Sequence, residues 1–165
     1  MKQFVILSII SLAIFSGCSG HFERYTPSSE HERASTSYKN VRILEEGRSK
    51  IVLSTIYLND VYPKYTDGKA HFLIAFYSKE NNSTIYFEKS DEEVKKGYTL
   101  LLNGKSAIDA KELDRDDLLR ELMPINNSWN RYFYVRYELP SGKPVLVLEN
   151  GHIEPVVITY QIAQE

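Results

Sequence analysis

The sequence is poor in the residues that usually carry recognisable chemistry. It has one cysteine, Cys18, in 165 residues, so an intrachain disulfide and a multi-cysteine metal site are both excluded. It contains no Gly-x-Ser-x-Gly motif, the nucleophile elbow of many serine hydrolases. Its 20 Lys and Arg against 22 Asp and Glu give a formal charge of −2, without the basic excess that is typical of nucleic-acid-binding proteins. We therefore expect no nucleic-acid partner.

The sequence also lacks an apolar run long enough for a transmembrane helix, which needs about 20 residues. Its longest run covers residues 4–16, follows the positive Lys2 and ends at the small residue Gly17. A positive start, a short apolar stretch and a small residue before the break are typical of a secretory signal peptide. The sequence predicts such a peptide over residues 1–17.

The end of this run, Phe15-Ser16-Gly17-Cys18, resembles the lipobox of bacterial lipoproteins. In that family an aliphatic residue, usually leucine, and two small residues precede an obligatory cysteine. The resemblance implies that a diacylglyceryl group is linked to Cys18. It also implies that lipoprotein signal peptidase recognises Phe15, Ser16 and Gly17 and cuts before Cys18, after which the freed amine can be acylated. Two or more acyl chains hold a protein firmly on a bilayer.

The same resemblance bears on localisation. Ser19 follows the cysteine, whereas an aspartate at that position retains enterobacteria-like lipoproteins at the inner membrane. The expected location is therefore the cell envelope, with the outer membrane facing the periplasm favoured over the inner membrane and surface exposure left open. Membrane lipid is the partner implied for Cys18.

Residues 18–40 are rich in Ser, Thr and charged residues and show no apolar periodicity. Such a composition predicts a flexible tether that begins at the lipidated cysteine. The remaining segment, residues 41–165, is expected to form one domain.

Strand-like segments follow one another quickly in this domain: residues 41–44, 51–62, 71–77, 84–88, 98–102, 106–110, 129–138, 144–149 and 154–162. Within 51–62 the apolar parity changes, since Ile51 and Leu53 share one parity and Ile56 and Leu58 the other. A change of this kind predicts a bulge or a strand that switches sheets.

Turn signals link some of these strands. Asn103-Gly104 predicts a hairpin between 98–102 and 106–110, and Asn150-Gly151 predicts one between the last two strands. A short helix is expected after Asp114 as N-cap, with Leu118, Leu119 and Leu122 as its apolar stripe. Seven to nine short strands with one helical insertion favour an antiparallel immunoglobulin-like β-sandwich, and a small β-barrel is the alternative.

Few residues in the domain point to catalysis. His71 lies on the face opposite Phe72 and Ile74, so it is expected to be solvated or at a rim, and His152 follows a turn. The acidic residues within 109–117 could suit calcium, but the stretch has no glycine and helix capping explains it more simply. We expect no catalytic residue, no metal and no cofactor other than the covalent lipid.

The strand at 129–138 is the most distinctive candidate for binding. Its alternation directs Trp129, Phe133, Val135 and Tyr137 to the core, which leaves Tyr132, Tyr134 and Arg136 pointing outward. Tyrosine and arginine are enriched at binding hot spots, although a cross-strand aromatic ladder gives the same pattern. Separately, residues 80–84 (Glu-Asn-Asn-Ser-Thr) resemble the acceptor sequon of bacterial oligosaccharyltransferases and would place a glycan on Asn82.

The function expected from these features is non-enzymatic. The sequence predicts an envelope lipoprotein whose β-sandwich binds or scaffolds another envelope protein. Two alternatives stay open: an enzyme active on cell-wall or glycan substrates, and a small-ligand carrier.

Overall fold

A computed structural model describes residues 28–62, 65, 67–80, 83–89 and 97–161. The predicted signal peptide, the lipobox with Cys18 and the predicted acceptor Asn82 lie outside these residues. The described elements are, in chain order, α2 (Ser29–Ser37), β1 (Tyr38–Glu45), β2 (Arg48–Tyr57), α3 (Leu58–Val61), β3 (Lys69–Ser78), β4 (Thr84–Tyr86), β5 (Gly97–Leu102), β6 (Asp109–Glu112), the 3₁₀ helix η1 (Leu118–Leu122), β7 (Arg131–Glu138), β8 (Val145–Asn150) and β9 (Ile153–Thr159).

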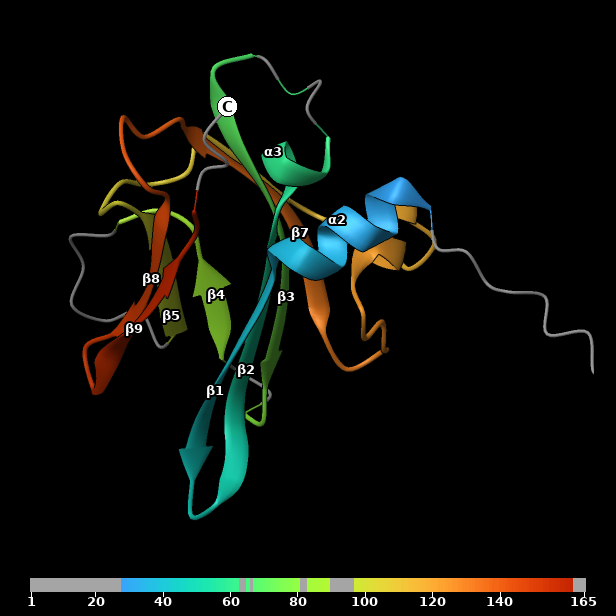
Figure 1. The fold of residues 1–165 in the computed structure, drawn as a ribbon. Coiled ribbons are helices and arrows are strands. Elements are labelled where there is room, and N and C mark those ends of the chain that lie inside the picture. Colours follow the sequence, from blue (N-terminus) through green and yellow to red (C-terminus); the bar gives the residue numbers. More distant parts are fainter. Residues whose placement is uncertain (1–27, 63–64, 66, 81–82, 90–96, 162–165) are drawn as a thin grey trace, which may run out of the picture.

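The strands form two sheets, and the predicted β-sandwich is confirmed (Figure 1). One sheet has the order β1-β2-β3-β7-β6 and the other β4-β5-β8-β9, so the described strands form two separate sheets and do not close into one barrel. Neighbouring strands run antiparallel except β4 and β5, which are parallel. None of the helices among the described residues is long and apolar enough to span a membrane.

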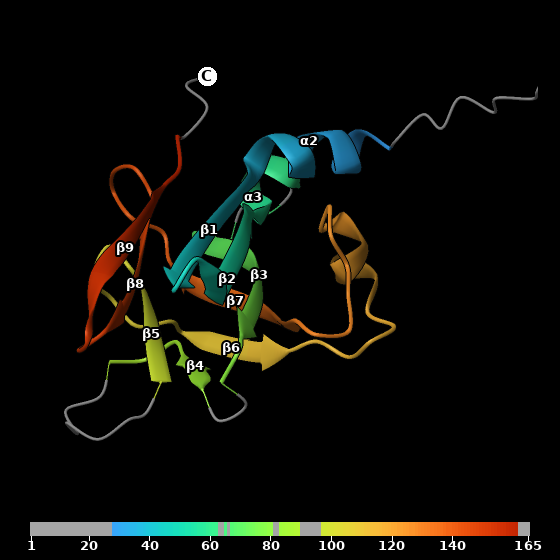
Figure 2. The ribbon, with the colours of Figure 1, turned by 90° about the horizontal axis from the view of Figure 1, so that it is seen from below.

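Two apolar cores hold these layers together. The first fills the space between the sheets and includes Phe72 and Phe133 from one sheet and Leu100 and Leu146 from the other. The second lies on the outer face of the five-stranded sheet, where helices cover it. Figure 2 shows α2 and the orange η1 segment on the side of this sheet that faces away from β8 and β9.

The parity change in β2 reflects these two cores. Ile51 and Leu53 belong to the first core, whereas Ile56 belongs to the second, because both faces of this part of β2 are covered. The predicted bulge or sheet switch within 51–62 is therefore wrong, since β2 stays in one sheet and pairs with β3 in continuous register from Ile51 to Tyr57. The register shift lies earlier, between β1 and β2, next to Ile43.

The fold begins earlier than the sequence suggested. Residues 28–40 were expected to belong to the tether, but they form α2 and the start of β1. The Ser28 side chain caps α2 by accepting a hydrogen bond from the His31 backbone N–H. The buried residues of α2 are both small, Ala34 and Ser37. A helix with so narrow a contact face does not show the apolar periodicity that would identify it in the sequence. Nine residues, rather than twenty-two, separate Cys18 from the first described residue.

The Asn103-Gly104 turn is confirmed, but its return strand is not. Both residues have positive φ, and Leu102 and Lys105 exchange backbone hydrogen bonds across the turn. After the turn the chain leaves this sheet and forms β6 beside β7 in the other one. The antiparallel partner of β5 is β8 instead, and the predicted hairpin of β8 and β9 is confirmed.

The segment before β7 also differs from expectation. The helix is one 3₁₀ turn capped by Asp117, whose side chain accepts from the Leu119 N–H, and Asp114 is not its cap. Trp129 precedes β7 and is 78% exposed, so its predicted place in the core is wrong. Arg131 begins the strand, where its guanidinium bonds the Glu112 carboxylate at 2.6 and 2.9 Å.

Candidate functional site

A cluster of polar and aromatic side chains occupies the outer face of β3, β7 and β6. The register places His71 opposite Arg136 and Asp109 opposite the same arginine, so all three side chains share one face. The segment after α3 adds Tyr65 and Asp67. We call this cluster the tyrosine–histidine face; it consists of Tyr65, Asp67, His71, Asp109, Tyr134 and Arg136.

His71 is the centre of the face. The sequence predicts a solvated or rim position for it, yet His71 is only 2% exposed. Its Nδ1 lies 2.6 Å from the Tyr134 hydroxyl, and its Nε2 lies 2.8 Å from the Asp67 carboxylate. The Tyr65 ring stacks on the imidazole with centroids 4.2 Å apart and an angle of 8° between the planes. Alternation along β3 identified the face on which His71 lies, but it carries no information on the segment between α3 and β3, from which Tyr65 and Asp67 cover this residue.

The chemistry of the partners fixes the hydrogen-bond directions in the neutral ring. An ionised carboxylate only accepts, so Nε2–H of His71 donates to Asp67 and Nδ1 accepts from the Tyr134 hydroxyl. The bond from His71 lowers the pKa of Asp67, while burial raises the pKa of Tyr134. The network keeps Asp67 charged and Tyr134 neutral. It therefore positions the tyrosine and does not activate it as a nucleophile.

Arg136 is held just as firmly at the edge of this face. Its Nε donates to the Asp109 carboxylate at 2.9 Å, and its Nη2 donates to the second oxygen. The pKa of Asp109 is lowered by this pairing. A two-pronged arginine–carboxylate pair fixes the guanidinium in orientation as well as in place. The Arg136 side chain remains 38% exposed.

The third residue of the predicted binding surface does not belong to it. Tyr132 is 1% exposed and lies in the second core, with the Arg120 guanidinium 4.1 Å from the centre of its ring. Its hydroxyl accepts from the Asn127 N–H at 2.9 Å and donates to the Ile125 carbonyl at 3.3 Å. The prediction that Tyr132 points to solvent is wrong because the segment around η1 folds over this part of β7.

This segment, residues 113–130, is organised by the buried Arg120, and we call it the braced loop. The guanidinium of Arg120 donates to the Asp114 and Asn127 carbonyls and to the Asn126 side chain, at 3.1 to 3.4 Å. The Asn127 side chain in turn accepts from the backbone N–H groups of Trp129 and Asn130. Sequence reasoning missed this arrangement, since an arginine within a leucine-patterned stretch looks like a solvated helix residue.

Three of the acidic residues within 109–117 have protein partners in the structure. Asp109 and Glu112 pair with arginines, and Asp117 caps η1. Within the described ranges, no three His, Cys, Asp or Glu side chains come together as metal ligands would. His152 lies exposed at the β8–β9 turn.

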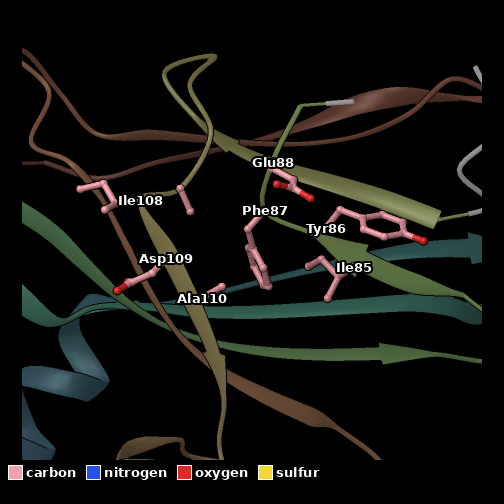
Figure 3. A pocket seen from close by; sticks show the side chains of 8 residues that line it. Ile85, Tyr86, Phe87, Glu88, Ile108, Asp109 and Ala110 are labelled. Atoms are coloured by element: carbon pink, nitrogen blue, oxygen red, sulfur yellow. The ribbon is translucent and has the colours of Figure 1, made fainter. Parts of the chain in front are cut away.

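A small cleft opens between the edges of the two sheets (Figure 3). Ile85 and Phe87 line it from the β4 side, and Ile108 and Ala110 line it from the β6 side. Its volume of about 260 Å³ is below that of most small-molecule sites. Side chains of the first core pack between the sheets beside this cleft.

A larger, polar groove of about 1,180 Å³ lies between α2 and the end of β9. Its charged lining residues are Glu32, Arg33, Lys39, Asp60 and Lys143. Burial raises the pKa of Asp60, and a hydrogen bond from Ser37 at 3.5 Å offsets this only in part. A carboxyl of raised pKa in a groove is a candidate proton donor.

Comparison of the chain with protein-family models, with curated proteins and with solved structures found no match.

Proposed function

We propose that this protein is a lipid-anchored component of the cell envelope whose β-sandwich binds another envelope protein through the tyrosine–histidine face. The observation that carries the proposal is the fixed geometry of Tyr134 and Arg136, which are held by His71 and Asp109 respectively. Tyrosine and arginine dominate binding hot spots. A residue already held in place loses little conformational entropy when a partner binds.

The proposed anchor limits where this partner can be. With lipid on Cys18, the chain to Ser28 spans at most about 35 Å even when fully extended. The domain then stays within roughly its own diameter of the bilayer, and the partner is a membrane protein or a membrane-proximal one. The outer membrane is the favoured site, on the basis of Ser19.

Site-specific crosslinking tests the face. Lys111 is exposed on β6 and pairs with Tyr134 across the sheet. A photoreactive residue at Lys111 should give one discrete adduct in cells, and Arg136→Glu should abolish it. Glu154, exposed on β9 of the other sheet, is the matched control position and should give none. An adduct at Lys111 that persists in the Arg136→Glu variant would contradict the proposal.

A second candidate, an enzyme active on cell-wall or other glycans, is favoured by Asp60. This carboxyl combines a raised pKa with a place in the large groove, where Arg33, Lys39 and Lys143 would attract an anionic substrate. The full-length protein should then release soluble fragments from purified cell wall, and Asp60→Asn should stop the release. Asp67→Asn, outside the groove, is the matched control and should retain it. Intact cell wall after incubation with the wild-type protein would rule this function out.

A further inference from the structure

The braced loop displays three large apolar side chains to solvent. Trp129 is 78% exposed, Leu118 75% and Ile125 58%. Among the other large apolar residues that are exposed in the described part of the chain, Leu44 lies on β1 and Val157 on β9, whereas Ile108 and Leu139 flank the paired strands β6 and β7. Apolar side chains gathered on one segment mark an interaction surface more often than scattered ones do.

The exposure of these side chains is built into the fold. The Arg120 bonds hold both ends of the loop, and the Asn127 side chain holds the backbone at the exposed Trp129 by accepting a hydrogen bond from its N–H. The Tyr132 hydroxyl donates a hydrogen bond to the Ile125 carbonyl and holds this part of the loop against β7. These bonds hold the loop in a shape that buries Leu122 and Met123 but leaves Leu118, Ile125 and Trp129 in contact with solvent.

The position of the loop indicates what lies there. The loop packs against α2, because Leu122 and Met123 share the second core with Ala34. Both views show the orange η1 segment beside the N-terminal half of α2 (Figures 1 and 2). The N-terminus of α2 is where the chain from Cys18 joins the domain, after nine residues. A lipid anchor on Cys18 would therefore hold this side of the domain toward the bilayer.

We propose that the braced loop lies on the membrane surface, with Trp129, Leu118 and Ile125 entering the interfacial layer of the bilayer. Tryptophan is enriched at that depth of membranes, because its ring is apolar and its N–H is polar. This inference rests on the lipid anchor of the proposed function. It orients the tyrosine–histidine face, which lies on another part of the same sheet, for a partner beside the domain.

Charge indicates which membrane suits the loop. Acidic residues surround η1, namely Asp114, Asp116, Asp117 and Glu121, against the single exposed cation Arg115. Anionic lipid would repel this set, so the contact depends on apolar insertion and not on electrostatic attraction. The interaction should be stronger on zwitterionic vesicles than on anionic ones and should change little with salt.

Trp129 is the only tryptophan in the chain, so its fluorescence reports on the loop directly. The purified, lipidated full-length protein would be reconstituted into zwitterionic phosphatidylethanolamine–phosphatidylcholine vesicles, with and without brominated acyl chains. We expect the emission to shift to shorter wavelength on reconstitution and to be quenched by the brominated lipid. Leu118→Ser with Ile125→Ser should reduce both effects while the protein stays on the vesicles.

A relocated tryptophan provides the matched control. In the Trp129→Phe background, Val157→Trp places the single tryptophan on β9, and its emission should stay unshifted and unquenched. Mass spectrometry and vesicle flotation establish the anchor separately. A lipidated, vesicle-bound protein whose Trp129 stays unquenched would overturn the inference and leave the anchor standing. An absence of lipid on Cys18 would instead overturn the proposed function. Crosslinking of the loop to a protein in cells, without quenching in vesicles, would assign the loop to a protein partner.

Discussion

The outer face of the five-stranded sheet has two parts that differ in what covers them. One part lies under α2, α3 and the braced loop, where Ile56, Leu73 and Tyr132 are buried. The other part is the tyrosine–histidine face, where Tyr134 and Arg136 keep contact with solvent. Tyr132 and Tyr134 belong to the same strand and the same face, only two residues apart.

Because of this difference, we expect the covered part of the face to contribute mainly to stability and the other part mainly to binding. The covered part contributes apolar burial, so changes there should act mainly on folding. The tyrosine–histidine face is held by hydrogen bonds and ion pairs whose outer partners, Asp67, Asp109 and Arg136, are partly solvated. Contacts with solvated partners contribute less to stability. Substitutions on the tyrosine–histidine face can therefore test binding without unfolding the protein, and the two parts can be told apart by experiment.

The largest expected effect is at Tyr132. Tyr132→Ala removes a fully buried ring and should lower the free energy of unfolding by about 3–5 kcal/mol. Tyr134→Ala should cost only about 1 kcal/mol, because it removes one side-chain hydrogen bond and a half-buried ring. Urea unfolding followed by circular dichroism measures both. Equal losses for the two variants would contradict the division of the face.

The next effect concerns Arg120. Arg120→Met keeps much of the apolar volume but removes the bonds to the Asp114 and Asn127 carbonyls, and it should cost about 2 kcal/mol. Hydrogen exchange should speed up within residues 113–130 and stay unchanged in β8 and β9. Lys143→Met, a cation outside the braced loop, is the control and should leave exchange in the loop as it is.

A smaller effect is expected at His71. In His71→Gln the new side chain cannot stack on Tyr65 or reach both Asp67 and Tyr134. The free energy of unfolding should fall by about 1 kcal/mol. The contribution of Asp67 has a definite pH dependence, because its pKa is lowered in the folded protein. A lowered pKa stabilises the fold above the unfolded value of about 4, and this stabilisation is lost as the pH falls through the folded value.

Unfolding measured at several pH values checks this. The wild-type protein should have a larger free energy of unfolding than Asp67→Asn at neutral pH, and this difference should disappear in acid. In the His71→Gln background, Asp67→Asn should have a clearly smaller effect at neutral pH. A gap between wild type and Asp67→Asn that stays constant down to strongly acid pH would show that the His71 bond does not hold the carboxylate.

The smallest effect has the opposite sign. Burial raises the pKa of Asp60, so its charged form destabilises the fold above its folded pKa, and stability is regained as the pH falls through that value. Asp60→Asn should therefore be slightly more stable than wild type at neutral pH, with the difference fading in acid. Thermal unfolding over a pH series measures this, and a destabilised variant at neutral pH would contradict the assignment.

Local signals in the sequence determined much of the fold. The Asn103-Gly104 turn, the β8–β9 hairpin and the alternation of β3 all follow from residue preferences and strand periodicity. These signals depend only on residues close in sequence, so they can be recognised without knowing the tertiary contacts. Together they were enough to predict a β-sandwich. They did not predict which strands pair, since the chain after Lys105 crosses to the other sheet.

The candidate site was only half predictable. The sequence by itself placed Tyr132, Tyr134 and Arg136 on one outward face, and the structure keeps that face. Only the tertiary structure decided that Tyr132 is buried beneath the braced loop, that His71 is enclosed by Tyr65 and Asp67, and that Trp129 is exposed. The physical reason is that periodicity fixes the direction of a side chain relative to its own strand. Burial depends on which other segment packs over that side chain, and the pattern of the strand itself does not record it.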